Sequence, residues 1–202
     1  MSINFPMETE RLVLLPGENA RDNTAFLQML RADGDFRLFC GVDFSESNLA
    51  GFDGYLEQAI RYALYQKEAP DELLGYVGIF NRGGCWETEF YIKKSERRNG
   101  YCSEALRALC AAAFAGELRA QGEDGTTEIL ILDEIHAIAI AENIAARGLL
   151  EKNAFIEPDT GAAWVMQVLF DPETGAQYDN QIAEYVLKKA SAYWEQLRHE
   201  QG

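Results

Sequence analysis

Apolar and polar positions alternate along residues 86–92 with the two-residue period of a half-buried strand. One face of this segment carries Glu87, Glu89 and Tyr91, and the other carries Trp86, Thr88, Phe90 and Ile92. The period lengthens to that of a helix from Tyr101 to Glu117. The apolar residues on the buried face of this helix are Leu106, Leu109, Cys110, Ala113 and Phe114. The pattern therefore predicts a strand, a polar connection and a helix.

The same patterns predict further elements on both sides of this pair. Strands are expected at Arg11–Leu15, Arg61–Lys67, Leu73–Phe80, Ile135–Ile140, Trp164–Phe170 and Tyr185–Lys188. Helices are expected at Asn19–Arg31, up to Ile60, at Asn143–Lys152 and at Ala190–Arg198. The segment Thr126–Leu132 fits either a strand or the end of the preceding helix.

Turn-forming residues separate these elements. Asn81–Gly84 is a hairpin signal, and the other loops are expected at Ala69–Glu72, Gly122–Thr127 and Asp171–Asn180. Hairpin-linked strands followed by a strand, a helix and a strand predict a mixed sheet with helices on its faces. A chain of 202 residues suffices for one sizeable core. We therefore expect one domain over residues 1–202, with a short C-terminal helical extension from about residue 190.

The composition narrows the class of function. A formal net charge of -15 argues against general nucleic-acid binding, and it suits a cationic partner or simply a solvated acidic surface. No apolar run approaches the length of a membrane-spanning helix, and residues 1–11 carry no secretory signal. The four cysteines form no C-x-x-C pair and the chain has two histidines, so we expect no metal site. Free thiols without a signal favour the cytoplasm.

The connection from Lys93 to Ser103 combines several features of an anion-binding site. It opens a helix, and the first N–H groups of a helix lack acceptors and carry partial positive charge. Gly100 lets the backbone approach a ligand closely. Basic side chains occupy four of six positions, at Lys93, Lys94, Arg97 and Arg98. The alternative is an ordinary polar loop with a glycine turn, and spacing alone does not separate the two.

The pattern Arg97-x-x-Gly100-x-Cys102 resembles the R/Q-x-x-G-x-G/A signature of GNAT N-acetyltransferases. Its continuation to Leu106 is similar to the RimJ/RimL-like branch, which includes enzymes that acetylate the N-termini of ribosomal proteins. Further segments resemble the family in the same order, at Thr9–Leu14, Leu74–Gly78, Asn143–Phe155 and Tyr185–Leu187. The resemblance implies the α+β GNAT fold, a central twisted and mostly antiparallel sheet with a splayed strand pair, flanked by helices.

The resemblance also implies acetyl-CoA as the co-substrate. The backbone N–H groups that would hold its pyrophosphate belong to Arg97, Arg98, Asn99, Gly100, Tyr101, Cys102 and Ser103. The backbone around Ile92 would pair with pantetheine, and the Asn143 amide would reach the same arm, cap its helix, or do both. Arg98 replaces a frequent Gly of the family. Cys102 stands where Gly or Ala is usual, and we expect a small packing residue there rather than a thiol with a lowered pKa.

The implied acetyl transfer needs a base for the attacking amine. Glu89 is the first candidate because it lies on the strand that leads to the loop, although it also fits a solvent-facing residue paired with a cation. Tyr91 is the second candidate. Leu150 stands where many GNAT enzymes have a tyrosine that acts as general acid.

Three functions are compatible with these residues. The first is N-acetyl transfer to a protein N-terminus, a polyamine or another small cationic amine. The second is a non-catalytic acyl-CoA sensor, and the third is transfer from a bulkier acyl-CoA. The sequence is compatible with a monomer or a homodimer.

Overall fold

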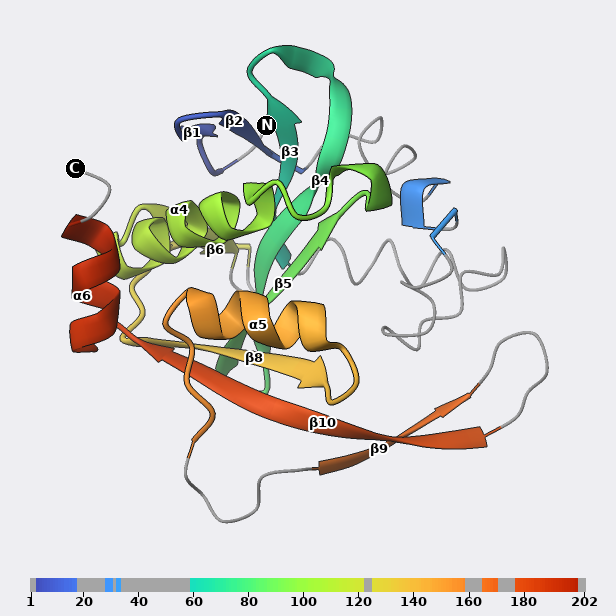
Figure 1. Ribbon diagram of the computed structural model, residues 1–202. Helices are drawn as coiled ribbons and strands as arrows, with labels where there is room; N and C mark the ends of the chain where they lie inside the picture. The colour runs from blue at the N-terminus through green and yellow to red at the C-terminus, as the bar shows by residue number, and fades with distance from the viewer. Residues whose placement is uncertain are drawn as a thin grey trace.

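An eight-stranded sheet forms the centre of the computed structural model, which describes residues 3–17, 28–30, 32–33, 59–121, 125–158, 165–170 and 177–199 (Figure 1). The strand order is β1-β2-β3-β4-β5-β8-β10-β9, and every neighbouring pair is antiparallel except β5 with β8. The strands are β1 (Met7–Glu8), β2 (Leu12–Pro16), β3 (Ala59–Gln66), β4 (Ala69–Arg82), β5 (Cys85–Ile92), β8 (Glu134–Ile140), β9 (Val165–Phe170) and β10 (Gln177–Lys188). This arrangement confirms the predicted mixed, mostly antiparallel sheet.

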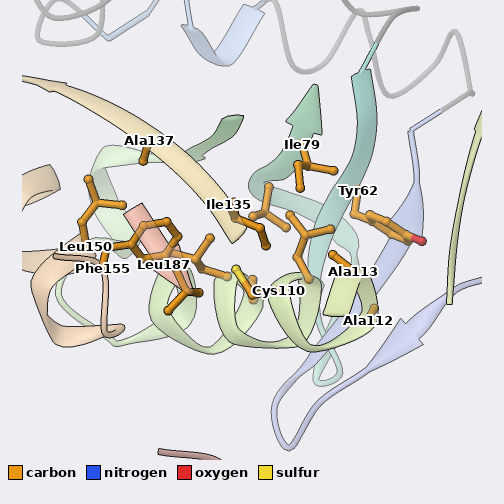
Figure 2. Packing of buried hydrophobic residues seen from close by; sticks show 14 of the residues in the cluster. Tyr62, Ile79, Cys110, Ala112, Ala113, Ile135, Ala137, Leu150, Phe155 and Leu187 are labelled. Carbon is orange, nitrogen blue, oxygen red and sulfur yellow. The ribbon is translucent and has the colours of Figure 1, made fainter. Parts of the chain in front are cut away.

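Helices pack on this sheet. They are the 3-10 turn η2 (Lys94–Glu96), α4 (Tyr101–Ala115), α5 (Ile144–Lys152) and α6 (Ala192–His199). All five predicted apolar residues of α4 are at most 3% exposed. They belong to one core cluster with Ile135 of β8, Leu150 of α5 and Phe155. Figure 2 shows Cys110 and Ala113 of α4 on the side of the helix that faces the sheet. At the far end of α4, Phe114 meets Trp194 of α6 edge to face, with ring centroids 5.7 Å apart.

The two faces of β5 have different surroundings. Trp86, Phe90 and Ile92 pack with the core cluster that contains α4, as the alternation predicts. Glu87, Glu89 and Tyr91 therefore point to the opposite face of the sheet. This opposite face is the one on which a polar site can be built.

Several expected boundaries are wrong. The segment expected as a loop at Ala69–Glu72 is the start of β4, and the turn shrinks to two residues because register shifts at the end of β3 absorb the extra length. The helix expected up to Ile60 is replaced there by β3, with Ile60 opposite Ile79. Residues 177–180, expected as part of a loop, open β10 because β9 supplies a ladder for them. Backbone pairing has overridden local turn and helix preferences at these positions.

A second, two-stranded sheet follows α4. It pairs β6 (Leu118–Gln121) with β7 (Thr127–Leu130), so the ambiguous segment Thr126–Leu132 is a strand rather than a helix end. The sequence patterns missed β6, because four residues show too little of the two-residue period. The expected helix Asn19–Arg31 lies largely outside the described residues.

The parallel contact between β5 and β8 is very short. Its ladder contains one register pair, Glu87 opposite His136, and no other residue of these two fully described strands is paired across it. Beyond this pair the C-terminal ends of the two strands lie apart (Figure 1). The predicted splayed strand pair is therefore present, and the chain continues from its two ends into α4 and α5.

Candidate functional site

The loop between β5 and α4 ends in an uncapped helix N-terminus. Gly100 is the N-cap residue, with φ of 84° and ψ of -3°, and no side-chain hydrogen bond caps the helix. The N–H groups of residues 101–103 precede the first turn that supplies intrahelical acceptors. A Cβ built on Gly100 comes within 4 Å of only one atom of the described residues, Nη2 of Arg11 at 3.3 Å. A side chain at this position would therefore meet Arg11, and Gly100 itself is exposed.

Arg98 also adopts a left-handed backbone, with φ of 67°. Such a conformation costs an ordinary L-residue about 1–2 kcal/mol and costs glycine almost nothing. This explains in physical terms why the resembling family often has glycine at the position. The loop geometry is retained here at the cost of local strain.

The side chain of Arg97 turns back toward the sheet. Its Nε donates to the carbonyl of Ile92 at 3.1 Å, and its guanidinium pairs with the buried carboxylate of Asp33. The guanidinium also lies over the ring of Tyr91, 5.5 Å from the centroid. Arg97 is therefore engaged within the protein, and what it can offer a ligand is its backbone N–H.

Tyr91 belongs to the same buried cluster. Its hydroxyl donates to Oδ2 of Asp33 at 2.7 Å. Burial, reinforced by this hydrogen bond and the charge of Asp33, raises the pKa of Tyr91 well above its ordinary value of 10.0. The hydroxyl therefore stays protonated at neutral pH. No local pattern in the sequence marks Asp33, which lies 58 residues from Tyr91 and 64 from Arg97.

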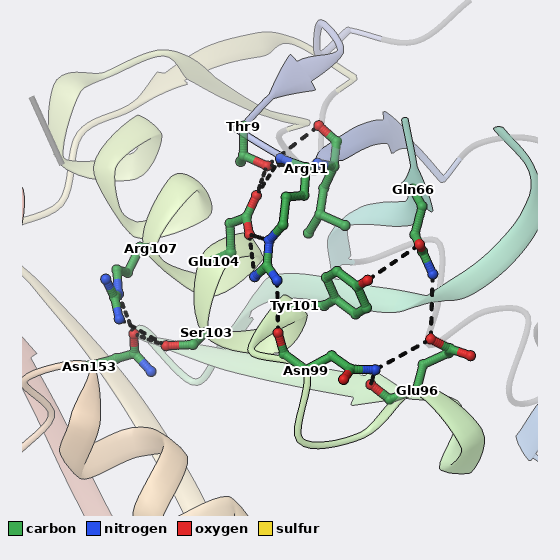
Figure 3. A network of polar contacts seen from close by, with 11 residues as sticks. Thr9, Arg11, Gln66, Glu96, Asn99, Tyr101, Ser103, Glu104, Arg107 and Asn153 are labelled. Atoms are coloured by element: carbon green, nitrogen blue, oxygen red, sulfur yellow. Dashed lines mark hydrogen bonds and ion pairs between the residues drawn. The ribbon is translucent and has the colours of Figure 1, made fainter. Parts of the chain in front are cut away.

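The first turn of α4 is held from the side of β2, as Figure 3 shows. Glu104 accepts hydrogen bonds from Thr9 and from the backbone and side chain of Arg11. Burial alone would raise the pKa of Glu104, but these hydrogen bonds and the charge of Arg11 outweigh it and lower the pKa. Two of the segments that resemble the GNAT pattern, Thr9–Leu14 and the loop, are thus in direct contact.

The same turn is held from the side of α5 by Asn153, which is 1% exposed. Its Oδ1 accepts from Ser103 Oγ and from Arg107 Nε, both at 2.8 Å, and its amide donates to Leu149. The start of α4 is therefore clamped between the N-terminal strands and the end of α5 (Figure 3). No local pattern in the sequence marks Asn153 as a site residue, although it lies within the segment Asn143–Phe155 that resembles the family.

Asn143 caps α5, because its Oδ1 accepts from the N–H of Ala146 at 3.1 Å. Its side-chain NH₂ makes no hydrogen bond with the residues that the structure describes. The capping role is confirmed, and the amide donor is still available to a ligand. Asn143 and the loop follow the C-terminal ends of the parallel strands β8 and β5, so both lie at the same end of the sheet.

Glu89 lies on β5 opposite Gly78 of β4. A Cβ on Gly78 would come 3.4 Å from Oε1 of Glu89 and 3.3 Å from the carbonyl of Ile60, so the glycine leaves room for the carboxylate. Leu150, at the position of the family's tyrosine, is fully buried in the core. The structure therefore offers a carboxylate on β5 near the splay, and a buried apolar side chain where many GNAT enzymes have a tyrosine.

Burial raises the pKa of the Cys102 thiol to about 12, which favours a packing residue over a thiol activated by the helix N-terminus. The basic side chains of the loop are only partly available to an anion, since Lys93 pairs with Glu72 and Arg97 with Asp33. Within the described segments, no group of three or more His, Cys, Asp or Glu residues could hold a metal ion. No helix in those segments is long and apolar enough to cross a membrane.

The family model described as "Acetyltransferase (GNAT) domain" matches residues 11–156. The chain belongs to the GNAT acetyltransferase family. Members of this family use acetyl-CoA, and an uncapped helix start beside a splayed strand pair suits the pyrophosphate and pantetheine of that molecule. No curated protein matches the chain.

Solved structures share the GNAT fold at low sequence identity. An acetyltransferase from Agrobacterium tumefaciens str. C58 has a TM-score of 0.63 and 19% identity, covering 94% of this chain and 96% of its own. A putative acetyltransferase from T. thermophilus has a TM-score of 0.67 and 17% identity, covering 99% and 98%. RimL, a ribosomal L7/L12 α-N-protein acetyltransferase, has a TM-score of 0.63 and 13% identity, covering 91% and 94%. These similarities establish the fold of this GNAT chain.

Proposed function

We propose that this protein is an N-acetyltransferase that moves an acetyl group from acetyl-CoA to a primary amine. The observation that carries the proposal is the parting of β5 from β8 after Glu87 and His136, together with the loop that leads from β5 into the uncapped start of α4. Acetyl-CoA supplies an acetyl group activated as a thioester. Holding two reactants in line accounts for much of the acceleration in transfer reactions.

The binding residues are those of the loop and of the two strand ends. Backbone N–H groups of residues 97–103 would hold the pyrophosphate, with the helix dipole adding to the attraction. The backbone at Ile92 and the free amide donor of Asn143 would hold the pantetheine arm. The Cys102 side chain, with its raised pKa, serves as packing only.

Glu89 is the proposed base. It points to the face of the sheet opposite α4, in the space left by Gly78, and a carboxylate there can take the proton that the amine loses. Tyr91 is proposed to hold Asp33 in position rather than to act as a base, because its hydroxyl donates to Asp33.

The acceptor is proposed to be cationic, since the net charge of -15 attracts such molecules. A protein N-terminus, as in the RimJ/RimL-like branch that the motifs resemble, is one such acceptor, and a polyamine is another. The described cysteines Cys85, Cys102 and Cys110 are free thiols, which supports a cytoplasmic location.

A non-catalytic acyl-CoA sensor is the second candidate. Buried Leu150 favours it, because this position has no tyrosine that could act as general acid. The release of free thiol from acetyl-CoA and from bulkier acyl-CoA donors, measured with a panel of amines, separates these functions. Coenzyme A binding without turnover across the panel would support the sensor and sink the transferase.

The role of Glu89 is tested by Glu89→Gln, with Glu87→Gln as the matched control on the same face of the same strand. Loss of a general base costs about 10²- to 10⁴-fold in kcat, and we expect that loss only in Glu89→Gln, with unchanged affinity for coenzyme A. A pH–rate profile that Glu89→Gln leaves unaltered would remove Glu89 as the base.

A further inference from the structure

The side chain of Arg11 lies across Gly100, in the loop between β5 and α4. Its Nη1 donates to the carbonyl of Asn99 at 2.9 Å, and its guanidinium lies 4.7 Å from the centroid of the Tyr101 ring. Its Nη2 lies on one side of Gly100, 3.3 Å from where a Cβ would be. Arg11 therefore contacts the residues immediately before and after Gly100, although it lies 88 positions earlier in the chain than Asn99.

Glu104 fixes this guanidinium. Arg11 Nε and Nη2 both lie 2.7 Å from Glu104 Oε2, and the backbone N–H of Arg11 donates to Oε1 at 2.8 Å. Thr9 donates to the same Oε1. The arginine is thus held at both its backbone and its side chain by one carboxylate of the helix, and its remaining amino group is directed at the loop (Figure 3).

The hydrogen bond from Arg11 to the Asn99 carbonyl also fixes the direction of the next N–H group, that of Gly100. In a trans peptide the C=O of one residue and the N–H of the next point in opposite directions, and the described chain has no cis peptide. Because the Asn99 carbonyl points to Arg11, the N–H of Gly100 points away from it, and Gly100 is exposed. An anion that approaches Gly100 from the side opposite Arg11 would meet an N–H that is already oriented.

We propose that Arg11 is a positioning residue for the cofactor: by holding the Asn99 carbonyl it turns the Gly100 N–H toward the pyrophosphate, and Glu104 holds Arg11 in place. The proposal rests on the proposed function, since it assigns the same loop to coenzyme A. Arg11 acts from behind the loop and does not touch the cofactor. Affinity for coenzyme A therefore depends on the Arg11–Glu104 pair, whereas turnover at saturation does not.

The test compares Arg11→Lys with the wild type by calorimetric titration with coenzyme A and with dephospho-coenzyme A, which keeps the pyrophosphate and lacks the 3′-phosphate. A lysine keeps the charge beside Glu104 but cannot reach Glu104 and Asn99 together, as the arginine fork does. We expect affinity for both ligands to fall by about tenfold or more, with KM for acetyl-CoA raised and kcat retained. Glu104→Gln is the second variant, with a smaller loss in the same direction.

Lys67→Met is the matched control. It removes the 3.1 Å ion pair between Lys67, which follows β3, and Glu8 of β1. Among the described residues, this ion pair makes no contact with the loop between β5 and α4. We expect it to leave affinity for coenzyme A unchanged. Melting temperatures of the variants separate a loss of affinity from a loss of folded protein.

The outcomes distinguish a failure of the proposed function from a failure of the proposed role of Arg11. If the wild type binds neither ligand, the proposed function fails and the role of Arg11 falls with it. If the wild type binds but Arg11→Lys and Glu104→Gln bind equally well, only the positioning role is overturned. A loss confined to coenzyme A would also overturn it, because the exposed guanidinium would then be contacting the 3′-phosphate directly.

Discussion

Substitution of Gly100 separates the backbone requirement at this residue from its proposed role beside the pyrophosphate. Gly100 has φ of 84°, and a left-handed backbone costs an ordinary L-residue about 1–2 kcal/mol. A Cβ here would come 3.3 Å from Nη2 of Arg11, and this contact is common to both variants. Gly100→Asn and Gly100→Asp have nearly the same shape, and we expect each to lower the free energy of unfolding by about 1 kcal/mol.

The two variants differ in charge, which is the quantity that binding of an anion senses. Two unit charges 4 Å apart interact by about 1 kcal/mol in water and by about 4 kcal/mol near a protein surface. Gly100 is exposed and has the guanidinium of Arg11 beside it, so the lower part of this range applies. We therefore expect Gly100→Asp to bind coenzyme A roughly 5- to 30-fold more weakly than Gly100→Asn.

Denaturant unfolding measures the first effect and calorimetric titration with coenzyme A measures the second. Gly83→Asn is the control, because Gly83 has φ of 60° in a hairpin turn with open space around it. It should show the cost of a left-handed backbone without any change in coenzyme A affinity. Equal affinities of Gly100→Asn and Gly100→Asp would refute the reasoning, since no anion could then lie at the start of α4.

Three further predictions concern the surroundings of this helix start. Asn153→Ala leaves the buried hydroxyl of Ser103 without its acceptor and is expected to lower the free energy of unfolding by about 2–3 kcal/mol, measured by urea denaturation. At neutral pH, iodoacetamide should alkylate exposed Cys85 well before Cys102, because the raised pKa of Cys102 keeps its thiol protonated. Peptide mass spectrometry measures the order of alkylation, and faster alkylation of Cys102 would contradict this prediction. Above the ordinary glutamate pKa of 4.5, Glu104→Gln should have a lower free energy of unfolding than the wild type by a constant amount. This difference in the free energy of unfolding should vanish as acid protonates Glu104 in the wild type. A difference that grows in acid would contradict the lowered pKa of Glu104.

Regular periodicity made much of the fold predictable. The buried face of α4 and the two faces of β5 follow from the spacing of apolar residues, and the structure has both. The start of β4 was mistaken for a loop because Ala69–Glu72 contains turn-forming residues, and the ladder with β3 decides its conformation instead. Local preferences of this size are easily outweighed by pairing with a neighbouring strand.

The candidate site was predictable only where its residues lie close together in the chain. The loop from Arg97 to Ser103 is one continuous segment, so its spacing could be compared with a motif. Asp33 contacts Tyr91 and Arg97 across a large sequence separation, and a single buried aspartate has no periodic signal of its own. The contact of Arg11 with Glu104 joins two segments whose resemblance to the family was visible, but the sequence alone does not say that they touch.

The one-residue contact between β5 and β8 has a consequence for how the sheet opens. Strands β1 to β5 are neighbours in chain order, whereas β8, β10 and β9 join them through a single parallel register pair and through packing against α4. Because only one register pair joins β5 to β8, the sheet is expected to open locally at this junction more readily than elsewhere. A ligand bound across the junction at 100 times its Kd would raise the free energy of that opening by about 2.7 kcal/mol. Saturating coenzyme A should then slow amide hydrogen exchange in both β5 and β8, and not in the loop alone.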